Sequence, residues 1–378
     1  MTRINAPWLT SSASKRICDA FQSRGYEIFF VGGCVRNQLM DREVTDLDLA
    51  TNAEPSEMLG LADAEGIKVI PTGIDHGTVT FVEDGVPYEI TTFRNDVETD
   101  GRRAVVAFSN DYREDAKRRD FTMNALYAKP DGTVLDPVDG LTDLKSGIVR
   151  FIGDANLRIK EDYLRILRFF RFHAWYGDTN EGIEPEGLAA CAEHVDQLPS
   201  LSKERVTTEL LKLLSAPDPS VAVASMEAIG ALMHVLPGSS ATALPVLIHL
   251  EAEYGLVVDP IARLCALGGE PENHMRLSKA QERTLSAYRD VYETPYEAGY
   301  RLRDLALHNL MIQAAHFGVN LDTKQVENAK IGMSVEFPVK ALDLMPTLSG
   351  KALGDKLKEL EQRWIISEFQ LTKDQLLD

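Results

Sequence analysis

The sequence predicts an α+β protein in which a mixed α/β head is followed by an all-helical remainder. Short apolar segments separated by Gly- and Asp-containing turns dominate the first third of the chain and indicate strands. From about Leu141 onward, apolar residues recur at helical spacing, with Ser and Pro at the expected helix ends. At roughly 100–200 residues per domain, the chain of 378 residues allows two to four domains.

The head is expected to contain four strands, two of which form a hairpin. The strands are expected at residues 26–35 (running into a Gly-Gly turn), 45–51, 76–82 and 86–94. An Asp-Gly turn at residues 84–85 joins the last two. Residues 35–41 are typical of the start of a helix, and residues 95–111, which carry Gly, Asp and paired Arg, are interpreted as a loop.

Hydropathy and cysteine content indicate a cytoplasmic protein. No apolar run approaches the roughly 20 residues that span a bilayer, and residues 1–16 lack the apolar core of a signal peptide. The four cysteines are far apart in the sequence and form no Cys-x-x-Cys pair: Cys18, Cys34, Cys191 and Cys265. This pattern indicates reduced thiols and argues against a zinc site or a disulfide framework.

The charge of the chain is unevenly distributed. A net charge of −18 argues against a nucleic acid partner, because phosphates are bound by basic surfaces. Between Gly101 and Arg171, however, 14 Lys and Arg outnumber 11 Asp and Glu, so the rest of the chain carries about −21. A positive groove on an acidic body is compatible with this distribution.

The first chemistry-bearing pattern is a Gly-Gly turn followed by an Asp-x-Asp strand. Asp46 and Asp48 are two residues apart, so on a strand their carboxylates point to the same face and suit Mg²⁺. Gly32 and Gly33 allow the backbone to approach phosphate, and Arg36 adds a charge for a triphosphate. An isolated Asp-x-Asp is common on solvated strand ends, but the combination of strand, turn, helix and strand is far more specific.

The second pattern is the run Arg118-Arg119-Asp120. Two adjacent guanidiniums can clamp a polyphosphate, and Asp120 is expected to orient one of them. The charges alternate in sign from Arg113 to Asp120, which is also typical of a solvated surface. Taken alone, this run favours the solvated surface.

The third pattern is a series of charged residues three positions apart: Asp162, Arg165, Arg168 and Arg171. This spacing predicts that they share one face of a helix. Cytosine and adenine each offer an amine donor beside a ring-nitrogen acceptor, which a carboxylate (Asp162) beside a guanidinium (Arg165) would match. Guanine and uracil would leave both protein groups unpaired, so this pair is a candidate protein template for C and A. The alternative is a helix surface with ordinary ion pairs.

Together these segments closely resemble the class II tRNA nucleotidyltransferase/poly(A) polymerase family. The resemblance is strong over residues 26–175 and weaker beyond them. The matching stretches are residues 31–39, 46–51, 72–82, 88–94, 100–108, 114–127, 135–154 and 159–172. Their order along the chain is highly specific to the family.

The resemblance implies a polymerase-β-like nucleotidyltransferase head with a mixed β-sheet, followed by an all-α neck, body and tail. The expected boundaries are residues 1–140 for the catalytic head, 141–215 for the neck with the nucleotide-selecting motif, 216–290 for the body, and 291–378 for a tRNA-binding tail. The implied activity is template-independent addition of CCA to the 3′ end of tRNA from CTP and ATP. Neither a membrane nor an obligate protein partner is expected.

The resemblance also assigns roles to individual residues. Asp46 and Asp48 would be the catalytic metal ligands for Mg²⁺, with Glu89 close to the metals. Contacts to the incoming nucleotide are expected from Gly32, Gly33, Arg36, Arg118, Arg119, Asp120, Asp162, Arg165, Arg168 and Arg171. One position departs from the family: Asn37 stands where an Asp is usual, so this site brings no charge.

Two alternatives remain open. Within the family, a poly(A) polymerase or a partial CC- or A-adding enzyme competes with full CCA addition. The segments at 68–81 and 93–108 look like those of the full CCA-adding members. From another class, a tRNA-binding protein without catalytic activity is the alternative, and the intact pair Asp46 and Asp48 argues against it. The chain has no His-Asp dipeptide, so no phosphohydrolase activity is expected.

Overall fold

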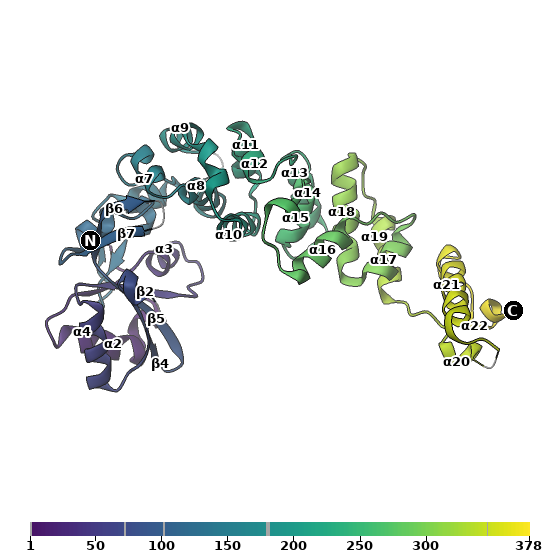
Figure 1. Cartoon of the computed structure of the whole chain (residues 1–378), viewed down its shortest axis with the longest axis horizontal. Helices are drawn as coiled ribbons and strands as arrows, with labels where there is room; N and C mark the ends of the chain where they lie inside the picture. The colour runs from purple at the N-terminus through teal and green to yellow at the C-terminus, as the bar shows by residue number, and fades with distance from the viewer. Residues whose placement is uncertain (1, 72, 101–102, 179–181, 346) are drawn as a thin grey trace. The chain divides into compact units, whose positions relative to one another are not determined.

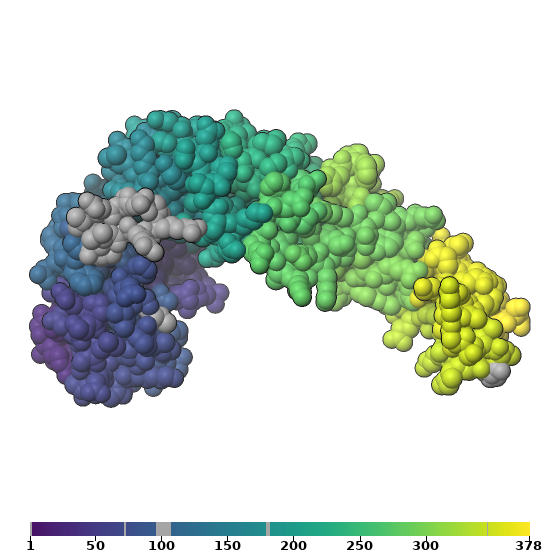
Figure 2. Space-filling view, in the orientation of Figure 1, coloured from purple at the N-terminus to yellow at the C-terminus, as the bar shows by residue number. Residues whose placement is uncertain are grey.

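A computed structural model describes residues 2–71, 73–100, 103–178, 182–345 and 347–378. The chain divides into two units, the first formed by Met1–Glu209 with Ala228–His234 and the second by Leu210–Glu227 with Val235–Asp378 (Figures 1 and 2). The first unit holds a mixed sheet together with helices, and the elements described in the second unit are helices joined by loops. The predicted α+β class is therefore confirmed, and the predicted four-part domain division stays a prediction.

The head is built on a seven-stranded sheet with the order β3-β4-β5-β2-β1-β8-β9. Its strands are β1 Ile28–Val31, β2 Leu47–Thr51, β3 Lys68–Ile70, β4 Thr78–Glu83, β5 Val86–Thr92, β8 Tyr127–Ala128 and β9 Val134–Leu135. Only β2 and β5 pair in parallel, and every other neighbouring pair is antiparallel. All four expected head strands are present, and β4 and β5 form the predicted hairpin.

The predicted loop at residues 95–111 is wrong over most of its length. Strands β6 Arg94–Asp100 and β7 Arg103–Phe108 pair antiparallel as a separate two-stranded sheet. Residues 104–108 are Ala, Val, Val, Ala and Phe, which suit a strand, but the polar residues before them concealed this preference. Residues 101–102, part of the same prediction, lie outside the described residues.

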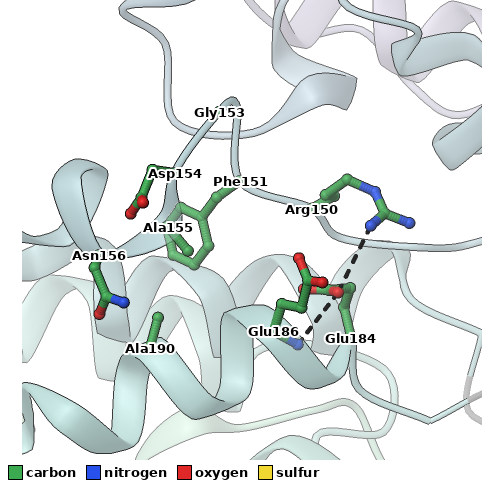
Figure 3. A pocket seen from close by; sticks show the side chains of 9 residues that line it. All are labelled: Arg150, Phe151, Gly153, Asp154, Ala155, Asn156, Glu184, Glu186 and Ala190. Atoms are coloured by element: carbon green, nitrogen blue, oxygen red, sulfur yellow. Dashed lines mark hydrogen bonds and ion pairs between the residues drawn. The ribbon is translucent and has the colours of Figure 1, made fainter.

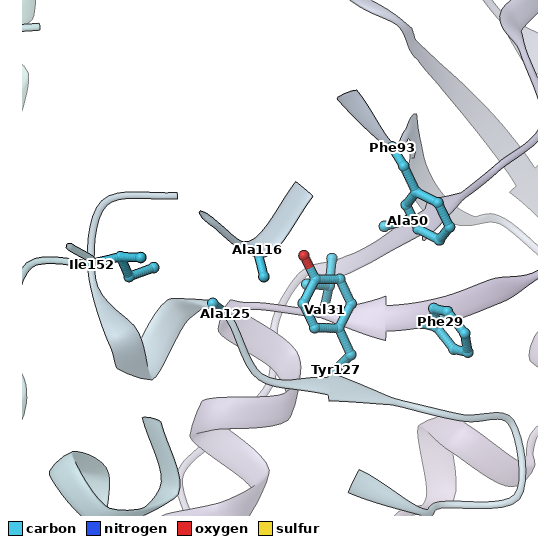
Figure 4. Close-up of a cluster of buried hydrophobic side chains, with 8 residues drawn as sticks. All are labelled: Phe29, Val31, Ala50, Phe93, Ala116, Ala125, Tyr127 and Ile152. Carbon is cyan, nitrogen blue, oxygen red and sulfur yellow. The ribbon is translucent and has the colours of Figure 1, made fainter. Parts of the chain in front are cut away.

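The central strand β1 is buried on both faces. On one face, Phe30 contacts Trp8, with ring centroids 5.0 Å apart, and helices α2 Ser12–Gln22 and α4 Pro55–Glu65 pack on the sheet. On the other face, a buried cluster contains Phe29, Val31, Ala50, Phe93, Ala116, Ala125, Tyr127 and Ile152 (Figure 4). Because successive strand residues point to opposite faces, the apolar run of β1 fills two cores and holds the turn after it in place.

The remaining helices follow the predicted trend from mixed to all-helical structure. They are α1 Pro7–Thr10, α3 Gly33–Leu39, α5 Tyr112–Lys117, α6 Gly140–Lys145, α7 Ala155–Glu161, α8 Leu164–Tyr176, α9 Pro185–Glu193, α10 Lys203–Leu214, α11 Ser220–Ala228, α12 Ala231–Val235, α13 Leu244–Glu253, α14 Pro260–Leu267, α15 Pro271–His274, α16 Lys279–Arg289, α17 Pro295–Leu302, α18 Ala306–Phe317, α19 Thr323–Ser334, α20 Ala341–Leu344, α21 Gly350–Ile366 and α22 Lys373–Leu377. Short 3₁₀ turns lie at Ile74–His76, Thr122–Asn124, Val195–Ser200 and Arg303–Leu305.

Within the second unit, helices α17 and α19 approach closely because glycines face each other. A Cβ placed on Gly299 would lie 2.1 Å from the carbonyl oxygen of Ala329, and one on Gly332 would lie 2.2 Å from that of Tyr296. The end of the chain packs around a cluster that consists of Val339, Leu344, Leu360, Trp364, Ile365 and Leu376. This unit therefore has apolar cores of its own.

None of the described helices is both long and apolar enough to cross a membrane. The four cysteines are buried free thiols, as expected from their spacing.

Candidate active site

The Gly-Gly turn and the Asp-x-Asp strand meet at one pocket in the head unit. The pocket has a volume of about 210 Å³ and is lined by Gly33, Cys34, Arg36, Asn37, Val44, Thr45, Asp46, Asp48 and Tyr176. Helix α3 contacts both β1 and β2, so the turn before it lies beside the start of β2. The structure thus brings the two predicted metal ligands, Asp46 and Asp48, together with Gly33 and Arg36.

Asp46 and Asp48 share one face of the chain, as predicted. Leu47 between them is buried, whereas Asp46 is exposed and Asp48 is partly buried, as strand alternation requires. The parallel register of β2 and β5 places Glu89 directly beside Asp48. Burial and the carboxylates of Glu89 and Asp46 raise the pKa of Asp48 to about 6, against the opposing effect of Arg119 and Arg36. The crowding of negative charge favours a bound cation.

The donor set fits a divalent metal that keeps other ligands of its own. Carboxylate oxygens are the ligands that Mg²⁺ prefers, and such sites commonly use one or two carboxylates together with substrate phosphates and water. Among the described residues, no group of three or more His, Cys, Asp or Glu side chains is arranged to hold a metal by itself. A divalent ion held by Asp46 and Asp48 would take its remaining ligands from water or from the phosphates of a substrate.

The glycine turn has a conformation that only glycine adopts easily. Gly32 has a φ of 72°, and its amide donates a hydrogen bond to the carbonyl oxygen of Leu126 at 3.1 Å. A Cβ on Gly32 would lie 3.6 Å from Nη1 of Arg119 and 3.6 Å from the carbonyl oxygen of Asn124. Because a Cβ would make only ordinary contacts there, the positive φ is what favours glycine, and the Arg119 guanidinium lies close to the turn.

Arg36 is buried, with 6% of its surface exposed, and is held by several partners. Its guanidinium donates to the side-chain oxygen of Asn124, to the Tyr176 hydroxyl at 2.8 Å and to Oδ1 of Asn37 at 2.9 Å. The guanidinium carbon also lies 4.0 Å from the centroid of the Tyr176 ring, a cation–π contact. Burial lowers the pKa of Arg36. Arg36 thus has a fixed orientation at the pocket wall.

Asn37 performs two hydrogen-bonding tasks at the position where the family usually has Asp. Its side-chain oxygen accepts from Arg36, and its amide donates to the carbonyl oxygen of Glu43 at 2.9 Å. An Asp could accept from Arg36 but could not donate to Glu43. The residue therefore orients Arg36 without adding negative charge next to Asp46 and Asp48.

Arg118 and Arg119 both bind the buried carboxylate of Asp115 at the end of α5. Arg118 donates to Oδ1 through Nε at 2.8 Å, and Arg119 donates to Oδ2 through Nη2 at 3.0 Å. The Tyr127 hydroxyl donates to the same Oδ2 at 2.7 Å. Burial alone would raise the pKa of Asp115, but the two guanidiniums and the hydroxyl outweigh it and lower the pKa to about 2.

The expectation that Asp120 orients Arg118 or Arg119 is therefore wrong. Asp120 instead accepts from Nε of Arg168 at 2.8 Å and from the side-chain amide of Asn124 at 2.9 Å. Its backbone lies past the end of α5, so its side chain faces helix α8 rather than the preceding arginines. Through Asn124, this carboxylate is connected to Arg36.

The expectation that Asp162 shares a helical face with Arg165 is also wrong. Asp162 has an extended backbone (φ −157°, ψ 106°) in the break between α7 and α8, and its carboxylate accepts from Arg205 at 2.6 Å. Arg165 lies in α8, where it pairs with Glu161 and donates to the carbonyl oxygen of Arg118 at 3.3 Å. The relative position of the Asp162 and Arg165 side chains is therefore set by the loop between α7 and α8, not by their spacing along one helix.

Arg168 and Arg171 lie on α8 as predicted and share a further carboxylate. Nε of Arg171 donates to Glu209 at 2.5 Å, and Nη1 of Arg168 lies 3.8 Å from the other carboxylate oxygen of Glu209. Glu209 is buried, with 5% of its surface exposed. Arg168 and Arg171 therefore each have a carboxylate partner.

Several residues at the site were not singled out from the sequence. Asp115 could have been found, because it lies three and four residues before Arg118 and Arg119, the spacing of helical ion pairs. Tyr176, Arg205 and Glu209 come from elements far along the chain and left no local signal.

Another pocket in the head unit contains none of the predicted site residues. It has a volume of about 220 Å³ and is lined by Arg150, Phe151, Gly153, Asp154, Ala155, Asn156, Glu184, Glu186 and Ala190 (Figure 3). Arg150 pairs with Glu184 across it at 3.6 Å. Its lining carries three acidic residues and one arginine, a net negative charge that is unsuited to a triphosphate.

Comparisons with known proteins bear on the same segments. Residues 28–150 match the family model of the poly A polymerase head domain, and residues 182–242 match that of the probable RNA and SrmB-binding site of polymerase A. Mitochondrial CCA tRNA nucleotidyltransferase 1 of Danio rerio is 32% identical over 387 residues, which cover 96% of this chain and 88% of the relative. The human counterpart is 33% identical over 98% of this chain and 90% of its own length.

A bacterial relative and two solved structures extend the comparison. The CCA-adding enzyme of Levilactobacillus brevis is 43% identical over 54% of this chain and 51% of its own length. The crystal structure of the Bacillus stearothermophilus CCA-adding enzyme in complex with CTP is 24% identical and covers 97% of this chain and 96% of its own, with a TM-score of 0.69. The structure of the Thermotoga maritima CCA-adding enzyme complexed with tRNA is 19% identical. It covers 100% of this chain and 98% of its own, with a TM-score of 0.69. These two structures share the fold of this chain.

Proposed function

This chain belongs to the CCA tRNA nucleotidyltransferase family, and we propose that it adds CCA to the 3′ end of tRNA from CTP and ATP. The reaction needs no nucleic acid template and releases pyrophosphate. One observation carries the proposal: Asp46 and Asp48 point into a single pocket beside a Gly-Gly turn and a fixed guanidinium. Metal ligands next to a phosphate-binding surface are what nucleotidyl transfer requires.

Asp46 and Asp48 are the residues that would hold Mg²⁺. When bound, divalent ions activate the attacking hydroxyl of the tRNA end and stabilise the negative charge of the leaving pyrophosphate. The chain itself contributes position and electrostatics, as in other phosphoryl-type transfers. Glu89 beside Asp48 raises the local negative charge and so strengthens the attraction for the cation.

The triphosphate of the incoming nucleotide would bind along the arginines that face the Gly-Gly turn. Arg119 approaches Gly32, and Arg36 lies at the pocket wall. Both guanidiniums are held by protein partners before substrate arrives, so little side-chain entropy is lost on binding. The adjacent Arg118 extends this positive surface.

Selection between nucleotides would be made by Asp162 and Arg165. The carboxylate would accept from the exocyclic amine of cytosine or adenine, and the guanidinium would donate to the ring nitrogen beside it. Each side chain is oriented by a second ionic partner, Arg205 for Asp162 and Glu161 for Arg165. Uracil and guanine would leave both groups unpaired.

The helical remainder would hold the tRNA, divided into a neck at 141–215, a body at 216–290 and a tail at 291–378. We further propose that the protein acts in the cytoplasm, since its four cysteines are free and widely spaced and no described helix suits a membrane.

The experiment that tests the function is extension of a tRNA that lacks CCA, followed by mass spectrometry of the product. With CTP and ATP together we expect three added residues ending in A, and then arrest. A long A tract made without CTP would indicate a poly(A) polymerase, and arrest after CC would indicate a partial enzyme. Binding of tRNA without any extension would indicate the non-catalytic alternative.

A further inference from the structure

A single carboxylate, Asp115, lies beneath two adjacent arginines, of which Arg119 approaches the glycine turn. It is 1% exposed, and it is the carboxylate partner of both Arg118 and Arg119. Its two oxygens are divided between them, Oδ1 for Arg118 and Oδ2 for Arg119. Asp115 therefore fixes the spacing of the two guanidiniums.

We propose that Asp115 is a positioning residue that holds Arg118 and Arg119 as a preformed clamp for the phosphates of the incoming nucleotide. This inference rests on the proposed function, because the clamp serves the nucleotide of that reaction. Asp115 itself touches no substrate in this arrangement, since it is covered by the arginines that it orients.

The donors that remain on the two arginines support a clamp. Asp115 uses Nε and Nη2 of both guanidiniums. Among the described residues, no hydrogen bond engages Nη1 of either arginine, and Nη1 of Arg119 lies 3.6 Å from where a Cβ on Gly32 would be. The free donor of Arg119 thus lies beside the turn, where a phosphate of the nucleotide could approach, and the neighbouring Arg118 keeps a second free donor.

The charge balance supports the same conclusion. Two guanidiniums share one carboxylate, so the group keeps a net positive charge. Their side chains are only 16% and 19% exposed, and a positive charge in such a partly desolvated position attracts phosphate more strongly than one in water. A pKa lowered to about 2 keeps Asp115 ionised at neutral pH.

Tyr127 makes the position of Asp115 rigid. Its hydroxyl donates to Oδ2 of Asp115, and its ring belongs to the buried cluster that also contains Phe29 and Val31. The clamp is thus connected to the core of the sheet rather than to a mobile surface. A rigid clamp binds phosphate without the entropy cost of ordering two long side chains.

The proposal makes a specific kinetic prediction, because CTP and ATP share their triphosphate. Asp115→Asn keeps the size of the side chain and removes its charge. We expect it to raise the KM for CTP and the KM for ATP in parallel, by roughly tenfold each, and to leave the choice between nucleotides unchanged. Inhibition by pyrophosphate, which has neither base nor sugar, should weaken to the same extent.

The matched control is Glu114→Gln on the same helix. Glu114 is partly exposed, and its side chain pairs only with Lys117 at 2.8 Å among the described residues, away from the clamp. This variant should keep wild-type KM values and wild-type inhibition by pyrophosphate. Both variants are compared in melting temperature, so that a loss of folding is recognised.

A folded Asp115→Asn protein with wild-type KM values and wild-type pyrophosphate inhibition would overturn the proposal, and so would a change confined to one nucleotide. If that variant does not fold, Tyr127→Phe decides the matter: a parallel rise of about threefold supports the proposal, and unchanged constants overturn it. CTP binding measured by calorimetry requires no turnover. It therefore separates failure of the clamp from failure of the proposed reaction, which the wild-type extension assay reports.

Discussion

Both units of the chain bury arginine against carboxylate, but they use the pair differently. In the second unit, Arg263 and Glu251 are 1% and 3% exposed, and the remaining guanidinium donors bind the carbonyl oxygens of Leu214, Ala216 and Pro217. In the head unit, Arg118 and Arg119 share Asp115 and keep donors free among the described residues. A buried arginine whose donors are all satisfied stabilises the fold, whereas one with donors to spare can bind a ligand.

The energetic consequences differ as well. In a fully enclosed ion pair, the attraction between the charges offsets the free-energy cost of removing them from water. Loss of either partner leaves the other charge buried and unpaired, which strongly destabilises the fold. Altering a partly open pair that keeps a net positive charge lowers the free energy of unfolding by less. Its main effect is a weaker affinity for an anionic ligand. Variants of the enclosed pair should therefore lose stability, and variants of the open pair should mainly lose binding.

Removing the carboxylate in the second unit should destabilise the protein most. Glu251→Ala leaves Arg263 buried without its ionic partner, and we expect a loss of roughly 3–5 kcal/mol in the free energy of unfolding of that unit. Urea unfolding measures this loss. Glu253→Ala on the same helix is the control, because Glu253 is exposed and should change stability by less than about 1 kcal/mol. Equal effects of the two variants would contradict the structural role of the pair.

The ion pairs of Asp115 in the head unit should make the free energy of unfolding depend on pH in the acid range. Because the pKa of Asp115 is about 2 in the folded chain and roughly 3.9 when unfolded, its contacts stabilise the fold above about pH 4. This contribution, on the order of 2 kcal/mol, is lost as the pH falls from 4 toward 2. Asp115→Asn should therefore lose less stability than wild type over that interval. Parallel acid unfolding curves for the two proteins would show that the contacts do not stabilise the folded state.

Disrupting the proposed nucleotide-selecting pair should give the smallest energetic change. Asp162→Ala or Arg165→Ala removes one hydrogen-bonding partner of the base, worth roughly 1–2 kcal/mol, so misincorporation of UTP or GTP should rise about tenfold. The misincorporation is measured by letting the correct and incorrect nucleotides compete in the extension assay. Lys160→Ala, an exposed neighbour on α7, is the control. Unchanged selectivity in both pair variants would remove Asp162 and Arg165 from the selecting role.

The sequence was sufficient to predict the features that depend on local order. Alternation placed Asp46 and Asp48 on one face, and the Gly-Gly turn indicated the neighbouring part of the same pocket. The α+β class and the family followed from the order of motifs along the chain, and both are confirmed. The roles of the individual site residues stay predictions.

The sequence was insufficient where long-range contacts determine the partner of a charged side chain. Helical spacing suggested one continuous face from Asp162 to Arg171, but the chain breaks at Asp162, where Arg205 from a later helix captures the carboxylate. Asp120 was assigned to the adjacent arginines, but a guanidinium from α8 binds it instead. Which of several nearby opposite charges becomes the partner depends on tertiary packing, which spacing alone does not encode.

The central claim is that Asp46 and Asp48 together hold the divalent ions of the reaction. The most direct measurement is single-turnover addition of AMP from ATP to a tRNA ending in CC, by wild type, Asp46→Ala and Asp48→Ala, with Asp63→Ala as an exposed control in the same unit. We expect each of the first two variants to lose at least about a thousandfold in rate, or roughly 4 kcal/mol, while tRNA binding and melting temperature stay near those of wild type. A near-normal rate in either variant would contradict the assignment.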